Sequence, residues 1–177
     1  LAHHREVQEQ RPRVWDVFPF HQEFDVLELR LNELDAVVDK FVIVEANLTH
    51  AGNPKPYYLT DNMERFARWK DKIIIKQVDL TTLDFTKFDY DPTWVLEHTQ
   101  RDAGREVLYA HCAPQDFVIV GDVDEIPRAA AVKAYVESNP EKAAVLVLDR
   151  YMYAINYKCI KTDEPQLNSK ILPYLTM

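Results

Sequence analysis

The apolar run from Phe117 to Val120 constrains the fold of this chain most strongly. It is short and rich in β-branched residues, which is typical of a strand buried on both faces of a parallel sheet. The run ends at Gly121, and three carboxylates follow within four residues: Asp122, Asp124 and Glu125. Open α/β sheets bind ligands beyond the carboxyl ends of their strands, so this stretch predicts a ligand-binding site at the end of the strand.

The two aspartates of this stretch are separated by a single residue. Like charges held this close are costly unless a cation lies between them. A hard divalent ion prefers oxygen ligands and usually shares one or two carboxylates with the phosphates of a substrate. The pair Asp122 and Asp124 therefore predicts a metal that also holds a diphosphate, and a solvated acidic turn is the alternative.

The rest of the chain alternates between two periodicities. Short apolar runs predict strands at 14–20, 41–44, 72–78, 117–120 and 143–148, and three- and four-residue spacings predict helices at 23–38, 92–111 and 128–138. Such alternation predicts an α/β fold, with a mostly parallel sheet flanked by helices. Asp16 and Pro19 predict that the first strand is short or near an edge, and Arg30 falls among the polar residues of the first helix.

The expected helix at 92–111 carries polar residues on one face. Asp91 before Pro92 is a strong start signal. Glu97 and Arg101 lie four residues apart, which is typical of a surface ion pair, and a contact of Arg101 with phosphates is equally open. Gly104 costs the helix about 1 kcal/mol relative to alanine, which predicts a close neighbour on its face.

Composition excludes several classes of function. The 177 residues predict one domain, and the net charge of −8, with a pI near 5.2, argues against a general nucleic-acid binder. Three glycines are too few for a phosphate-cradling loop. No apolar run reaches the ~18 residues of a membrane span. No leader peptide is visible, and the start at Leu1 leaves room for one that was removed or left out. The two cysteines, Cys112 and Cys159, either pair or stay free.

Several motifs, in the right order, resemble glycosyltransferase family 17. They lie at 23–34, 38–47, 52–56, 65–67, 94–102 and 121–127, so the resemblance covers roughly residues 14–157. It implies a GT-A-type nucleotide-diphospho-sugar transferase fold, UDP-N-acetylglucosamine (UDP-GlcNAc) as donor, Mn²⁺ or Mg²⁺ as cofactor and inversion at the anomeric carbon. It also implies a mannose-containing glycan or glycoprotein as acceptor and, for eukaryotic members, the Golgi lumen as compartment.

The resemblance gives roles to individual side chains. Asp122 and Asp124 match the metal-binding Asp-x-Asp, and Asp122 alternatively reaches the ribose. The other donor-binding candidates are Glu45, Lys55, Glu97 and Arg101. Inverting transfer needs a general base, for which Glu125 and Asp149 are candidates. Alternatively the base lies beyond Met177, and Glu125 supports the other acids of the site. Three aromatic residues either stack on a sugar or base or belong to the core: Trp94, Tyr153 and Tyr157.

We therefore expect a flexible arm at 1–13, a donor-binding domain at 14–157 and an irregular segment at 158–177. This last segment departs from the family, whose members continue further, so the chain is alternatively a truncated, non-catalytic nucleotide-sugar-binding fragment. A second alternative is a phosphohydrolase of the haloacid dehalogenase type, in which Asp122 would attack phosphorus.

Overall fold

The structure, a computed structural model, describes residues 11–149, 151, 169–174 and 177. Strands and helices alternate along most of this part of the chain. The strands are β1 Val14–Phe20, β2 Lys40–Ala46, β3 Ile73–Val78, β4 Phe117–Val120, β5 Ala144–Val145 and β6 Lys170–Pro173. The α-helices are α1 Phe24–Leu34, α2 Tyr58–Asp61, α3 Pro92–His111 and α4 Ala129–Glu137. Three 3-10 helices complete the set: η1 Met63–Trp69, η2 Leu80–Thr82 and η3 Phe85–Lys87.

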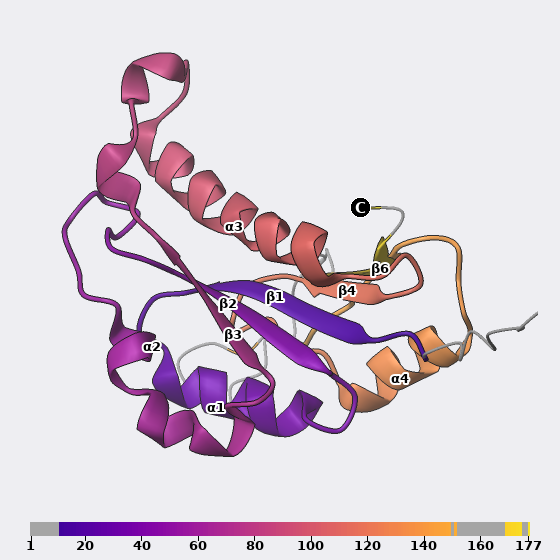
Figure 1. Cartoon of the computed structure of the whole chain (residues 1–177). Helices are drawn as coiled ribbons and strands as arrows, with labels where there is room; N and C mark the ends of the chain where they lie inside the picture. Colours follow the sequence, from indigo (N-terminus) through magenta and orange to yellow (C-terminus); the bar gives the residue numbers. More distant parts are fainter. Residues whose placement is uncertain (1–10, 150, 152–168, 175–176) are drawn as a thin grey trace, which may run out of the picture.

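The strands form one sheet in the order β3-β2-β1-β4-β6-β5. The first four are parallel to one another, and β6 runs antiparallel to both β4 and β5. Helix α3 covers one face of the sheet, and α1 and α4 cover the other (Figure 1). The predicted α/β fold, with a mostly parallel sheet flanked by helices, is confirmed.

Apolar side chains fill both interfaces between the sheet and its helices. On the α3 side, Leu108 packs with Trp15, Val17, Val42 and Val118 of the strands. The larger cluster lies on the other side and joins strand residues to α1 and α4 through four buried side chains: Leu27, Leu31, Leu34 and Val132. Because the central strands are covered on both faces, they read in the sequence as continuous apolar runs.

Helix α3 begins and packs as its sequence predicts. The Asp91 carboxylate accepts a hydrogen bond from the Thr93 backbone N–H at 2.8 Å and caps the helix. A Cβ atom on Gly104 would lie 2.7 Å from Val17 Cγ1 and 3.2 Å from Val44 Cγ2. The predicted close neighbour of Gly104 is therefore the sheet itself.

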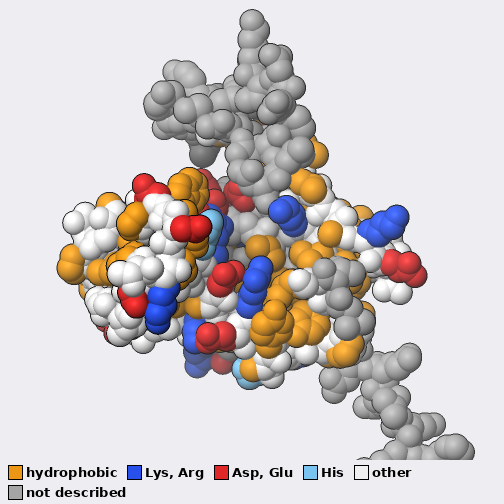
Figure 2. Space-filling model, turned by 90° about the horizontal axis from the view of Figure 1, so that it is seen from above, with side chains coloured by type: hydrophobic (Ala, Val, Ile, Leu, Met, Phe, Trp, Pro, Cys, Tyr) orange, Lys and Arg blue, Asp and Glu red, His pale blue; other side chains and the backbone are white. Residues whose placement is uncertain are grey.

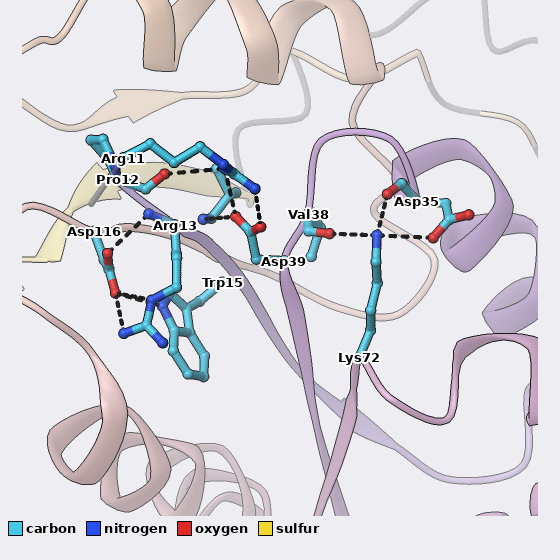
Figure 3. A network of polar contacts seen from close by, with 10 residues as sticks. Arg11, Pro12, Arg13, Trp15, Asp35, Val38, Asp39, Lys72 and Asp116 are labelled. Atoms are coloured by element: carbon cyan, nitrogen blue, oxygen red, sulfur yellow. Dashed lines mark hydrogen bonds and ion pairs between the residues drawn. The ribbon is translucent and has the colours of Figure 1, made fainter. Parts of the chain in front are cut away.

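Paired carboxylates hold the amino-terminal edge of the sheet together (Figure 3). Asp116 accepts hydrogen bonds from the Arg13 backbone N–H and from Trp15 Nε1, each at 2.9 Å. Asp39 accepts from the Val14 N–H at 2.9 Å and pairs with Arg11. These contacts tie the last residues of the expected flexible arm to the domain, while residues 1–10 lie outside the described part.

The structure corrects the expectation for the first strand, because β1 has seven residues and lies in the middle of the sheet. Asp16 is tolerated there because Arg30 donates to its two carboxylate oxygens at 2.7 and 2.8 Å. Pro19 is tolerated because the pairing with β4 ends at Val17, so β1 has a neighbour on one side only at that point.

Two further expectations near the end of the chain are wrong. The strand expected at 143–148 has only two residues, Ala144–Val145. The segment 158–177 was expected to be irregular, but Lys170–Pro173 form β6 between β4 and β5. Four residues carry too little periodicity to signal a strand that is fixed by its neighbours.

Candidate active site

A buried arginine builds the turn that follows β4. Arg30 is fully buried, and its Nη1 donates hydrogen bonds to the backbone oxygens of Asp122 at 2.8 Å and Glu125 at 2.9 Å. The same guanidinium holds Asp16 on β1. From the sequence, Arg30 counts among the polar residues of this helix. Its spacing of three residues from Leu27 and four from Leu34, however, puts it on the buried face of α1.

Glu125 is buried and shapes the same turn from inside. Its Oε2 accepts hydrogen bonds from the Asp122 N–H and from Ser169 Oγ, each at 3.0 Å. A Cβ atom on Gly121 would lie 2.1 Å from Ser169 Oγ and 2.8 Å from Glu125 Oε2, so glycine is needed where these groups meet. The carboxylate proposed as a base is therefore engaged in holding the turn.

Three of the predicted donor-binding residues come together beside this turn. Asp122 Oδ1 and Arg101 Nη2 form an ion pair at 2.5 Å, and Oδ1 has no hydrogen bond of good geometry. Arg101 also contacts Glu97 Oε1 through Nη2 at 3.0 Å. Burial disfavours the charge on Arg101, but Asp122 and Glu97 outweigh this effect and raise its pKa. The guanidinium is thus held in its charged form at the carboxyl edge of the sheet.

Asp124 is exposed and differs from the paired carboxylates of the opposite edge. Neighbouring groups displace part of its water, and this desolvation, followed by the negative charge of Asp122, raises the pKa of Asp124. Among the described residues, no three His, Cys, Asp or Glu side chains converge in a way that could hold a metal ion. The donor set of Asp124 and Asp122 fits a divalent ion that takes its other ligands from a substrate.

Glu45 and Lys55 lie in a second group, near the ends of β1 and β2. Glu45 is buried and accepts from the Leu59 N–H at 2.7 Å, and burial raises its pKa despite this bond. Lys55 is 8% exposed, and burial lowers its pKa. Its Nζ donates a long hydrogen bond of 3.4 Å to the Pro56 oxygen and lies 5.3 Å from the centre of the Tyr58 ring, and none of the ion pairs between described residues includes it. A buried ammonium group held this weakly fits the contact of an anionic ligand.

The remaining candidate residues are either exposed or outside the described part of the chain. Asp149 is exposed and follows β5. Trp94 is 54% exposed and contacts the His98 ring, so it is not a core residue. Tyr153, Tyr157 and Cys159 lie outside the described residues, so their predictions remain untested.

Sequence reasoning missed His50, which lies in the loop after β2. Its ring nitrogen Nε2 is 3.1 Å from Gln100 Oε1, and Nδ1 is 3.9 Å from Glu97 Oε2. Gln100 is buried in α3, and its amide nitrogen donates to the Val44 oxygen at 2.7 Å and the Phe20 oxygen at 3.2 Å. The glutamine thus joins α3 to the ends of β1 and β2, and a lone loop histidine gives no periodic signal for such a role.

Figure 2 shows one face of the molecule, on which acidic and basic side chains lie close together. No helix in the described part of the chain combines the length and apolarity needed to cross a membrane.

Known proteins resemble this chain in sequence. The family model described as Glycosyltransferase family 17 matches residues 1–166. The β-1,4-mannosyl-glycoprotein 4-β-N-acetylglucosaminyltransferases of Rattus norvegicus and Homo sapiens are each 29% identical to this chain over 123 residues. Each alignment covers 65% of this chain but only 22% of the relative, so the chain spans about a fifth of the length of these curated relatives.

A solved structure is also similar. The mannosyltransferase PcManGT of Pyrobaculum calidifontis, in complex with GDP-Man and Mn²⁺, aligns with a TM-score of 0.47 and 17% identity, over 80% of this chain and 37% of that one. The classification of this chain rests on the family match alone.

The matched family defines the class of proteins to which this chain is related, the glycosyltransferases. The chain belongs to glycosyltransferase family 17, as its motifs predicted. The alternative of a haloacid-dehalogenase-type phosphohydrolase is set aside on this ground, and Asp122 is better described as a partner of Arg101 than as a nucleophile.

Proposed function

We propose that this chain forms the donor-binding part of a metal-dependent inverting transferase. In this proposal it moves N-acetylglucosamine from UDP-GlcNAc to a mannose-containing glycan, as the names of its relatives suggest. The observation that carries the proposal is the juxtaposition of Arg101, Asp122 and the exposed Asp124 at the carboxyl end of β4. A guanidinium beside two carboxylates suits a diphosphate and its counterion.

Each side chain of the site has a separate task in this proposal. Asp124, with help from Asp122, would hold Mn²⁺ or Mg²⁺, and the bound ion neutralises charge on a departing diphosphate. Arg101 adds a fixed positive charge on the α3 side, and Glu97 keeps its guanidinium in place. Lys55 offers a second cation from the loop after β2, where a phosphate oxygen would supply the strong acceptor that its ammonium group lacks.

A general base must also take the proton of the acceptor hydroxyl, a contribution of typically ~10²–10⁴-fold. Glu125 is engaged with Asp122 and Ser169, which argues for a structural task. Asp149 is exposed beyond β5 and is the better candidate within the described residues. The non-catalytic fragment remains the alternative, since the chain spans a small part of its relatives.

The test is a product assay with labelled UDP-GlcNAc, Mn²⁺ and an N-glycan acceptor. We expect label on the acceptor, and we expect Asp149→Asn to stop this transfer while UDP binding persists. Glu125→Gln serves as the comparison, because it should alter stability along with activity. Donor binding without any transfer by the unmodified chain would support the fragment alternative, and absence of UDP binding in Mn²⁺ would overturn the proposal.

Replacing Arg101 by alanine should weaken UDP binding much more than uridine binding, because uridine has no phosphates. A charge-assisted hydrogen bond contributes about 1.5–3 kcal/mol, so the loss for UDP should be roughly ten- to hundredfold. Isothermal titration in Mn²⁺ measures both ligands. Arg105→Ala is the matched control, since Arg105 is an exposed arginine of the same helix that pairs with Asp102. Equal losses for UDP and uridine would place Arg101 away from the phosphates.

A further inference from the structure

Gln100 has only one orientation that satisfies its neighbours. Two of the atoms around its amide are the backbone oxygens of Phe20 and Val44, which can only accept hydrogen bonds. The amide nitrogen must therefore face these two oxygens and donate one proton to each. This leaves Oε1 facing His50, at 3.1 Å from Nε2.

The orientation of Gln100 determines the tautomer of His50. Because Gln100 Oε1 is an acceptor, His50 Nε2 must carry the proton that joins them. In the neutral ring Nδ1 then has a lone pair, and it lies on the side of Glu97, 3.9 Å from Oε2. Glu97 is meanwhile held through its other oxygen by Arg101.

The result is a pair of hydrogen-bond acceptors, His50 Nδ1 and Glu97 Oε2, which cannot bond to each other. Both side chains are reachable, with 41% of His50 and 20% of Glu97 exposed. We infer that this pair binds a vicinal diol of the ligand, with one hydroxyl donating to His50 and the neighbouring one to Glu97. The inference rests on the proposed function, in which the diphosphate lies beside Arg101, and Arg101 contacts Glu97.

Two parts of a nucleotide sugar carry a vicinal diol, the ribose and the transferred sugar. Isothermal titration in Mn²⁺ separates them by two affinity ratios. The first compares UDP with 2′-deoxy-UDP, and the second compares UDP-GlcNAc with UDP-GalNAc, which differs in the configuration of the sugar 4-hydroxyl. We expect one of these ratios to be about tenfold in the unmodified chain, which corresponds to ~1.4 kcal/mol, and to fall to near one in His50→Phe.

The His50→Phe variant keeps a planar ring in the loop but has no ring nitrogen, so it lacks the acceptor at Nδ1. His98→Gln is the matched control, because His98 is an exposed histidine of α3 that contacts Trp94 and Tyr90 instead. If both ratios are the same in His50→Phe as in the unmodified chain, the inference is wrong even though UDP binds. If UDP does not bind the unmodified chain at all, the proposed function is wrong, and the inference that rests on it falls as well.

The tautomer can be tested without any ligand. Long-range ¹H–¹⁵N spectra distinguish the two neutral forms of a histidine ring, and the signal of His50 is identified by its loss in His50→Phe. We expect the proton on Nε2. A proton on Nδ1 would overturn the inference, because that nitrogen would then donate to Glu97 and could not accept from a hydroxyl.

Discussion

Replacing Asp124 by alanine is expected to abolish metal-dependent binding of UDP. Asp124 is the exposed carboxylate of the site, whereas Asp122 is already paired with Arg101, so little remains to hold a divalent ion once Asp124 is lost. Titration of UDP with and without Mn²⁺ measures the effect, and the difference that the metal makes in the unmodified chain should disappear. Unchanged UDP affinity in Mn²⁺ for a folded variant would contradict the assignment.

The same substitution should not harm the fold. The pKa of Asp124 is raised by desolvation and by Asp122, so its ionisation costs folding free energy as the pH rises from the unfolded-state pKa to the higher folded-state pKa. The alanine variant should therefore be at least as stable as the parent near neutral pH, and any gain should vanish below the ordinary pKa of an aspartate, about 3.9. Glu106→Ala, which removes an exposed carboxylate that pairs with Lys76, controls for a general change of charge.

Replacing Arg30 by methionine should give the largest loss of stability. The change leaves Asp16 fully buried without its cation and also frees the backbone oxygens of Asp122 and Glu125. Breaking a buried ion pair from one side costs about 3–5 kcal/mol, which denaturant unfolding would measure. Arg68→Met is the control, since Arg68 is an exposed arginine whose pair with Asp35 should contribute less than about 1 kcal/mol.

A double variant separates the two tasks of Arg30. In Arg30→Met with Asp16→Leu, an apolar pair replaces the ion pair, which is often neutral or stabilising. Recovery should nevertheless be partial, because the oxygens of the turn still lack their donor. A single Arg30→Met variant as stable as the parent would contradict the structural role described for this residue.

Local signals in the sequence predicted the parts of the fold that depend on neighbours in the chain. Helix α3 occurs where Asp91 and Pro92 mark its start, and Gly104 lies against the sheet as its cost to the helix suggested. The meeting of Arg101 and Glu97 followed from their spacing along one helix face, but the contact with Asp122 joins two elements and had no local signal.

Other features depend on residues far away in the sequence. β6 pairs with β4 across a separation that no periodic pattern spans, and four residues of ordinary composition do not mark it. The acceptor pair of His50 and Glu97 requires the loop after β2 to approach α3, which only the assembled sheet brings about. The ion pair of Arg30 with Asp16 had a signal in the spacing of Arg30 along α1, but its charge argued for the surface.

The antiparallel strand β6 also determines how short a soluble piece of this domain can be. Lys170–Pro173 cover the side of β4 that faces away from β1, and Ser169 reaches the turn that carries Asp122. A polypeptide that ends before Ser169 would present β4 with a row of unpaired backbone groups, which is a template for aggregation. During synthesis β6 is made some fifty residues after β4. The pairing of β6 with β4 should therefore be the last part of the sheet to form.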